Sequence, residues 1–321
     1  MAGSGNDGKP KAVIPTIDLL DFPAQSKKLV EACEEWGCFR VVNHDHILPA
    51  SLMEEMKEMT KSLFDLPKEI KKRNKDNVLV GSGYVAPTFW RPLYEALGLY
   101  DMTSPHDVER FFNDLDLSPH QREIIVKYGK GVEGVMREVM KQLCEAVGVK
   151  REQHVDEWCW QLRLNKYHFT PEGVGSPGVP IHTDAGFLTL LQDDESVGGL
   201  EVISRSGEVV VVDPVPGCLL LNLGDVAVLW SNGRFCNTRH SVMCRQGSVR
   251  YSIVSFFLGP KEGVAVEPQP EFVDPTHPPM YLPATYFELR KFRMENNMHD
   301  GEVLELVRAP APAATPAEPE K

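Results

Sequence analysis

The chain has 321 residues, of which 42% are hydrophobic and 25% are charged, a composition that is ordinary for a globular protein. Its net charge of −12 argues against nucleic acid as a partner, because a basic surface is needed to attract the phosphate backbone. No run approaches the roughly 20 apolar residues of a membrane-spanning helix, so no membrane partner is expected.

The first part of the chain is predicted to be mainly helical. Residues 1–12 are small, polar and rich in glycine, and we expect a disordered tail there. Short strands are predicted at 14–19 and 36–44. Apolar residues recur at helical spacing in three stretches, which are residues 24–35, 49–64 and 119–147.

Residues 78–101 are rich in glycine and aromatic residues and show no strong hydrophobic period. We predict a long loop here that could cover a site. The basic run at 68–75 is predicted to be the solvated end of a helix.

Beyond residue 160 the chain changes to short apolar and β-branched runs separated by Gly and Pro, which is typical of a sandwich or jelly roll. The predicted fold is mainly β with α: a helical N-terminal region over 13–150, a double-stranded β-helix core with a closing helix over 151–300, and a disordered tail over 301–321. We expect that helix at 286–298. The expected strands are 162–169, 186–192, 200–203, 208–212, 218–222, 226–230 and 249–258.

The sequence His182-Thr183-Asp184 is the most informative pattern in the chain. Residues two apart on a strand point to the same side, so His182 and Asp184 are predicted to hold one face of a metal. His240, from a distant strand, can complete the set. Two histidines and one carboxylate form the facial triad of non-haem Fe(II) oxygenases, which leaves about three octahedral positions for a bidentate oxoacid and O2. The pattern therefore predicts oxidation chemistry.

Two other clusters have metal-ligand residues without the right setting. His154-Val155-Asp156 lies in a charged stretch where helical geometry turns the two ligands in different directions, so His154 is expected at the surface. His44-Asp45-His46 follows an apolar run and ends a predicted strand. We interpret it as hydrogen-bonded structure rather than a metal site.

Arg250 and Ser252 also share a face by strand periodicity. A buried arginine needs an anionic partner, and a planar guanidinium fits a carboxylate through two parallel hydrogen bonds. Spacing leaves two partners open, a ligand carboxylate or an internal Asp or Glu. The nearby Ser252 hydroxyl favours the ligand slightly.

The seven cysteines are scattered, odd in number and without a C-x-x-C pair, so we predict reduced thiols rather than disulfides or a zinc site. The first residues lack the apolar core of a signal peptide, and a cytoplasmic location is expected. Nothing in the sequence predicts an oligomeric state.

From about Ile14 to about Met298 the chain resembles the plant 2-oxoglutarate- and Fe(II)-dependent dioxygenases, whose fold is a distorted jelly roll with a helical N-terminal part. The matching motifs are Ile-Pro-Thr-Ile-Asp at 14–18, Trp-Gly-Cys-Phe-Arg-Val-Val-Asn-His at 36–44, His-Thr-Asp-Ala-Gly-Phe-Leu-Thr-Leu-Leu at 182–191, Asn-Leu-Gly-Asp at 222–225, Trp-Ser-Asn-Gly-Arg at 230–234 and Arg-Tyr-Ser at 250–252.

The resemblance implies Fe(II), the cosubstrate 2-oxoglutarate and O2, with ascorbate as a supporting reductant. It also implies the residues that hold them. These are His182, Asp184 and His240 for the iron, Arg250 and Ser252 for the distal carboxylate of 2-oxoglutarate, and Asn165 and Tyr167 beside the cosubstrate.

Two motifs depart from the family. Asn165-Lys166-Tyr167-His168-Phe169-Thr170 stands for the usual Asn-Tyr-Tyr-Pro-Pro-Cys, and Asn43-His44-Asp45 stands for Asn-His-Gly. The first motif, the Val-Gly-Gly-Leu-Glu turn at 197–201 and the Gly83-Tyr84 loop are most similar to the branch of the family that oxidises auxin. This similarity implies oxidation of indole-3-acetic acid to 2-oxindole-3-acetic acid, which inactivates the hormone.

An indole acid needs an apolar slot and a partner for its carboxylate. Arg163 shares a strand face with the Asn-x-Tyr motif, and we predict that it pairs with the substrate carboxylate; a structural ion pair is the alternative. The aromatic residues expected to form the indole wall are Tyr84, Phe89, Phe187 and Phe256.

Three other functions stay open at this stage. The same chemistry on another small carboxylic acid or on a gibberellin is compatible with every motif. An oxidase that uses ascorbate in place of 2-oxoglutarate would keep the iron triad. A non-catalytic jelly-roll binding module is disfavoured, because buried ionisable groups are costly without a partner.

Overall fold

The computed structural model describes residues 13–76, 82–150, 157–261 and 263–310. Its centre is a seven-stranded sheet in the order β1-β2-β9-β6-β11-β4-β3, beside a four-stranded sheet in the order β5-β10-β7-β8. All pairs within the two sheets are antiparallel except β1 with β2. The strands are β1 Thr16–Asp18, β2 Cys38–Val42, β3 Tyr94–Leu99, β4 Trp158–Tyr167, β5 Pro177–His182, β6 Leu188–Gln192, β7 Leu200–Ile203, β8 Val209–Val211, β9 Leu219–Leu223, β10 Arg239–Met243, β11 Arg250–Pro260, β12 Ala265–Val266 and β13 Ala284–Thr285.

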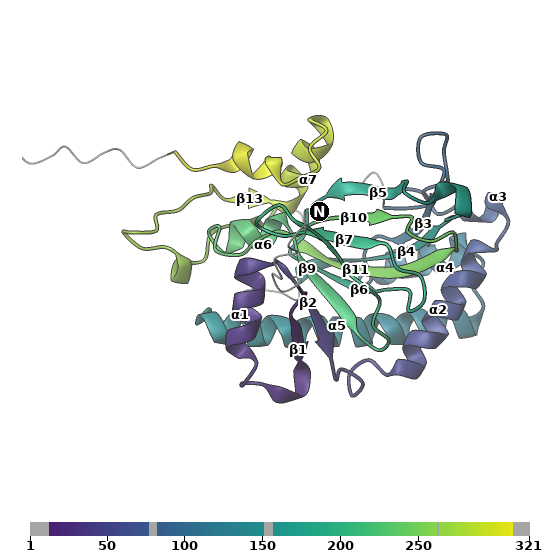
Figure 1. Ribbon diagram of the computed structural model, residues 1–321, viewed down its shortest axis with the longest axis horizontal. Helices are drawn as coiled ribbons and strands as arrows, with labels where there is room; N and C mark the ends of the chain where they lie inside the picture. The colour runs from purple at the N-terminus through teal and green to yellow at the C-terminus, as the bar shows by residue number, and fades with distance from the viewer. Residues whose placement is uncertain (1–12, 77–81, 151–156, 262, 311–321) are drawn as a thin grey trace, which may run out of the picture.

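Helices cover the outer face of the large sheet, where the long α5 runs beneath the strands with α1 and α2 beside it (Figure 1). The α5 helix starts at a capping box made by Ser118 and Gln121 and ends at Gly148, whose φ of 78° favours glycine. The helical segments are η1 Leu19–Asp21, α1 Ser26–Glu35, α2 Ala50–Phe64, α3 Lys68–Lys71, α4 Pro105–Asp114, α5 Pro119–Val147, η3 Pro171–Gly173, α6 Asp225–Trp230, η4 Pro270–Phe272, α7 Tyr286–Glu295 and η5 Glu302–Val307.

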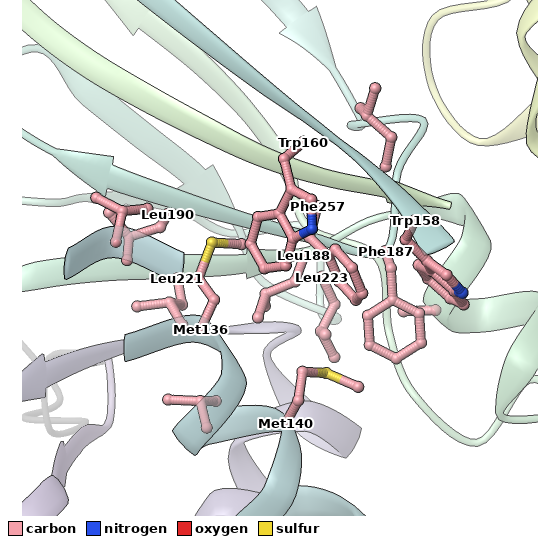
Figure 2. Close-up of a cluster of buried hydrophobic side chains, with 14 of the residues drawn as sticks. Met136, Met140, Trp158, Trp160, Phe187, Leu188, Leu190, Leu221, Leu223 and Phe257 are labelled. Carbon is pink, nitrogen blue, oxygen red and sulfur yellow. The ribbon is translucent and has the colours of Figure 1, made fainter. Parts of the chain in front are cut away.

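The main hydrophobic core lies between these helices and the large sheet. Met136 and Met140 of α5 point toward the aromatic side chains of β4 and β11 (Figure 2). Trp158 stacks on Phe257 with ring centroids 4.5 Å apart, and Trp160 lies 4.4 Å from the same ring. Full burial of each such side chain contributes about 1.5–3 kcal/mol, so this cluster fixes the position of both strands.

A second, smaller core lies between the two sheets. Tyr167 and Leu191 of the large sheet pack there with Leu200, Val202 and Val242 of the small one. This packing of two sheets confirms the predicted jelly-roll core. The predicted boundary between an N-terminal region and the core near residue 150 stays a prediction. The strands β1, β2 and β3, which precede this boundary, belong to the same sheet as β4, which follows it.

Three predicted elements are wrong. Residues 226–230 form the helix α6 instead of a strand, because all of them are buried and a short apolar run lacks a diagnostic period. The predicted loop contains β3, which pairs with β4; residues 77–81 of that loop lie outside the described residues. The predicted tail is wrong for residues 301–310, where Val303, Leu304 and Val307 of η5 are buried.

All seven cysteines carry free thiols. Within the described ranges, no helix has both the length and the apolar character needed to cross a bilayer.

Candidate functional site

The three predicted metal ligands meet at one point. His182 is the last residue of β5, and its cross-strand partner in β10 is His240. The imidazole centroids lie 4.2 Å apart, and one ligand atom from each of His182, Asp184 and His240 lies within 4.8 Å of the others. Two nitrogens and a carboxylate oxygen on one side of a cavity suit an octahedral Fe(II) with open positions.

Hydrogen bonds fix which nitrogen of each histidine is available. The Nδ1–H of His182 donates to the carbonyl of Pro180 at 2.9 Å, and that of His240 donates to the carbonyl of Thr238 at 3.0 Å. Both Nε2 atoms therefore keep a lone pair for a metal, the usual arrangement for a metal-ligating histidine.

The electrostatics of the site keep the ligands in their metal-binding forms. Burial, followed by the neighbouring His240, lowers the pKa of His182 to about 4, so its imidazole is neutral near pH 7. Burial acts to raise the pKa of Asp184, but His240, His182 and the Thr189 hydroxyl outweigh it and the net direction is downward. That hydroxyl donates to Asp184 Oδ2 at 2.6 Å.

The strand argument for His182 and Asp184 is only half right, because β5 ends at His182 and Asp184 lies in the loop that follows. The loop is held by a backbone contact in which the N–H of Asp225, at the start of α6, donates to the carbonyl of Asp184 at 2.9 Å. Gly224 allows this approach, since a Cβ there would collide with the carbonyls of Asp184 and Gly186.

Thr183, between the two ligands, has all its polar atoms engaged. Its N–H donates to His299 O at 2.8 Å, its hydroxyl donates to Asp225 Oδ1 at 3.0 Å, and its carbonyl accepts from Arg293 Nη2 at 2.7 Å. Arg293 of α7 also pairs with the fully buried Asp225. Asp225 and Arg293 were not singled out for a role at the metal site, since only the folded chain brings residues 183, 225 and 293 together.

The predicted cosubstrate residue Arg250 is fully buried. Its Nη2 donates to the Asp193 carboxylate, while Nε and Nη1 have no hydrogen-bond partner among the described residues. The guanidinium also lies over the ring of Tyr167, 4.7 Å from its centroid. The sequence left open an internal acid or a ligand carboxylate, and Asp193 is the internal acid.

One cavity of about 450 Å³ joins these groups. It is lined by the triad, by Arg250 and Ser252, and by Asn165 and Tyr167. The two buried, unpartnered nitrogens of Arg250 would each cost free energy if left unpaired, and a carboxylate in the cavity would satisfy them. The residues present therefore fit both an Fe(II) ion and a dicarboxylate such as 2-oxoglutarate.

Of the residues predicted for the substrate end, Arg163 and Phe256 line the cavity. Phe187 is fully buried against Trp158 in the helix-side core, and Phe89 is 85% exposed. The hydroxyl of Tyr84 donates to Glu95, and none of these three aromatic residues is among the described residues that line the cavity.

Residues from other segments also line the cavity. Val85, Arg91 and Tyr94 come from the segment predicted as a loop, with Gln161 from β4 and Arg290 from α7. Val85 forms an antiparallel bridge with Ala96 along the outer edge of β3, which places its segment at the cavity. A glycine- and aromatic-rich stretch without a period gives no sign of which side chains turn inward.

The cluster at His44 is separate from the site. His44 is buried, with Nδ1 3.2 Å from the carbonyl of Leu48 and Nε2 3.1 Å from that of Gly217. His154-Val155-Asp156 lies outside the described residues.

Comparisons with known proteins agree with this geometry. Residues 159–259 match the 2OG-Fe(II) oxygenase superfamily, and residues 14–89 match the N-terminal region described as that of a non-haem dioxygenase in morphine synthesis. The 2-oxoglutarate-dependent dioxygenase DAO of Oryza sativa subsp. japonica is 42% identical over 91% of this chain and 97% of its own. Gibberellin 3-beta-dioxygenase 1 of Pisum sativum is 30% identical over 86% of this chain and 75% of its own.

Solved structures give the same result. Dioxygenase for auxin oxidation 1 from Arabidopsis thaliana, in a binary complex with 2-oxoglutarate, superposes with a TM-score of 0.79 at 52% identity, over 83% of this chain and 100% of that one. The dioxygenase for auxin oxidation of rice superposes with a TM-score of 0.83 at 41% identity, over 92% and 100%. The chain therefore belongs to the 2-oxoglutarate- and Fe(II)-dependent oxygenases and is a dioxygenase of that family.

Proposed function

We propose that this dioxygenase oxidises indole-3-acetic acid to 2-oxindole-3-acetic acid. The observation that carries the proposal is the single cavity, which runs from a His-Asp-His cluster past a buried arginine to an end lined by both apolar and arginine side chains. Identity above 40% to two dioxygenases for auxin oxidation supports the choice of substrate.

The reaction consumes one O2 and one 2-oxoglutarate for each indole acid. One oxygen atom enters the indole ring at C2, the other enters succinate, and carbon dioxide leaves. Bound Fe(II) supplies the activation of O2. His182, Asp184 and His240 would hold it at the wall of the cavity.

Arg250 and Ser252 bind the distal carboxylate of 2-oxoglutarate in this proposal. The Asp193 carboxylate accepts a hydrogen bond from Nη2 of Arg250 and so fixes the direction of Nε and Nη1. Asn165 and Tyr167 form the wall beside the cosubstrate, and the Tyr167 ring lies under the guanidinium of Arg250. The site is preorganised, because each group is held by the fold before any ligand enters.

Arg163 pairs with the carboxylate of the substrate, while Phe256, Val85 and Leu258 provide apolar surface for the indole ring. A volume of about 450 Å³ lies within the usual range for a ligand site, roughly 300–1,000 Å³.

Ascorbate is proposed as a reductant that keeps the iron ferrous. We also propose a cytoplasmic location, which seven cysteines in reduced form support because disulfides are rare in that compartment.

Aerobic turnover with Fe(II), ascorbate and 2-oxoglutarate tests the reaction. Each indole acid or gibberellin of a panel is offered separately, and mass spectrometry reads succinate and the substrate plus one oxygen. We expect 2-oxindole-3-acetic acid and an equal amount of succinate. Gibberellins belong in the panel because of the relative from Pisum sativum; a hydroxylated gibberellin with no oxindole product would replace the auxin assignment, and absence of succinate throughout would overturn the mechanism.

A further inference from the structure

A chain of hydrogen bonds crosses the cavity wall from its substrate end to its cosubstrate end. Arg163 Nε donates to the hydroxyl of Tyr94 at 3.1 Å, and that hydroxyl donates to Asn165 Oδ1 at 2.8 Å. Asn165 Nδ2 then donates to Ser252 Oγ at 3.2 Å. All four residues line the cavity. They come from three adjacent strands, β3, β4 and β11, in which Asn165 faces Ser252 and Ala96 in register.

The chain has one direction, and Arg163 sets it. A guanidinium can only donate hydrogen bonds, so the phenol oxygen of Tyr94 accepts from it and the phenol hydrogen is left to donate onward. The carbonyl end of the Asn165 amide receives that hydrogen, which turns the NH2 end toward Ser252. The Ser252 oxygen thus acts as an acceptor within the wall.

The consequence is a restricted orientation for the Ser252 hydroxyl. Since its oxygen accepts from Asn165, its own hydrogen points away from Asn165 and is left to donate on the other side, where the Tyr167 phenol and the cavity lie. A hydroxyl that is free to rotate loses part of the free energy of a hydrogen bond to ordering, and one held in advance does not. A carboxylate beside Ser252 therefore meets a donor that already points at it.

We propose that Tyr94 is a positioning residue for 2-oxoglutarate, which acts through Asn165 by setting the Ser252 hydroxyl as a donor toward the cosubstrate carboxylate. This inference rests on the proposed assignment of Arg250 and Ser252 to that carboxylate. The link is specific to the phenol oxygen, because the Tyr94 ring also packs against Tyr167, with centroids 5.5 Å apart, and that contact needs no hydroxyl.

The test is the affinity for 2-oxoglutarate in the absence of turnover. Isothermal titration of 2-oxoglutarate into Mn(II)-loaded protein under argon gives Kd for the wild type, Tyr94→Phe, Ser252→Ala and the double variant. Tyr94→Phe keeps the ring and removes the link. We expect Kd to rise about tenfold, the loss of one to two hydrogen bonds.

The double variant separates positioning from a general loss of packing. If Tyr94 acts only through Ser252, adding Tyr94→Phe to Ser252→Ala leaves Kd at the value of Ser252→Ala alone. If the Kd of the double variant rose by the product of the two single fold-increases, the inference would be overturned. An unchanged Kd in Tyr94→Phe would also overturn it. An unchanged Kd in Ser252→Ala would overturn the carboxylate assignment and this inference with it.

Tyr128→Phe is the matched control. Tyr128 is fully buried in α5, and its hydroxyl has no hydrogen-bond partner among the described residues. The same atom is removed from a buried tyrosine away from the cavity, so we expect an unchanged Kd. A general loss of structure would also reduce Mn(II) binding, so melting temperatures are measured beside the titrations. We expect them to differ little among all variants.

Discussion

Arg293 and Asp225 form a buried ion pair across Thr183, the residue between two proposed metal ligands. The pair comes from α7 and α6, and it holds the backbone and the hydroxyl of Thr183 at once. The backbone between His182 and Asp184 is therefore held by side chains of α6 and α7.

Arg293→Met should weaken metal binding as well as stability. The variant leaves the Asp225 carboxylate buried without its partner, a change that costs about 3–5 kcal/mol. Release of Thr183 should raise the Kd for Mn(II) about tenfold or more, by analogy with other residues that orient metal ligands. Titration of Mn(II) and thermal unfolding measure the two effects. Arg308→Met, which removes an arginine paired with Glu305 at the surface, should change neither.

His240→Ala should abolish Mn(II) binding and turnover while the fold is retained. The side chain supplies one of three ligand atoms, whereas the backbone pairing of β10 with β5 and β7 does not depend on it. Titration of Mn(II) and circular dichroism give the two readouts. His277→Ala, on an exposed turn beside Asp274, is the control and should bind Mn(II) as the wild type does. Wild-type affinity in His240→Ala would place the metal elsewhere.

Arg250→Lys should raise the KM for 2-oxoglutarate by about 10- to 100-fold. A lysine ammonium can pair with Asp193 but cannot present two further parallel donors to a carboxylate. Initial rates at varied 2-oxoglutarate measure the change, with Arg245→Lys as the control, since Arg245 pairs with Glu201 in an exposed position. If Arg250→Lys and Arg245→Lys had the same KM for 2-oxoglutarate, the carboxylate of 2-oxoglutarate would bind a group other than Arg250.

Glu95→Gln should destabilise the protein near neutral pH by about 3 kcal/mol, the equivalent of its pKa shift. Glu95 is 3% exposed and accepts from Lys71 and Tyr84, each at 2.7 Å, and lies 2.9 Å from His168. Burial acts to raise its pKa, but the hydrogen bonds from His168, Lys71 and Tyr84 outweigh it and lower the pKa to about 2.

The sign of the pH dependence follows from that shift. A carboxylate with a lowered pKa stabilises the fold above its unfolded value of 4.5, and the contribution is lost as the pH falls toward 2. Urea unfolding at several pH values should show a gap between wild type and Glu95→Gln that narrows below pH 4.5. Glu58→Gln, from an exposed pair with Lys61, is the control. If the difference in the free energy of unfolding stayed constant with pH, ionisation of the Glu95 carboxylate would be excluded as its origin.

The cluster of proposed iron ligands could be predicted from sequence because the chemistry of the triad restricts the residue types and the spacing within His182-Thr183-Asp184. The residues that hold them could not, since Arg293 lies 110 positions from Thr183 along the chain. The same limit applies to the core. Phe256 lines the cavity, whereas Phe257 packs on Trp158 in the hydrophobic core. Only the register of β11 decides which of these adjacent aromatic residues faces the cavity.

The long helix at 119–147 was predicted with its exact bounds, because the helical spacing of its apolar residues is a local signal. The helix α6 was not, since six buried residues in a row show no period. Lys71 shows a further limit. It belongs to a basic run that was expected at the surface, but it is buried against Glu95, because its partner lies on the strand that was predicted as part of a loop.

The bridge between Val85 and Ala96 joins the segment around Val85 to the sheet along a single outer edge. That segment carries two residues that line the cavity, Val85 and Arg91, and none of the proposed iron or cosubstrate ligands. Exchange of this one edge segment between relatives would therefore alter which acid is accepted while the oxygen-activating machinery is inherited unchanged, so new substrates can evolve, or be engineered, by local grafting.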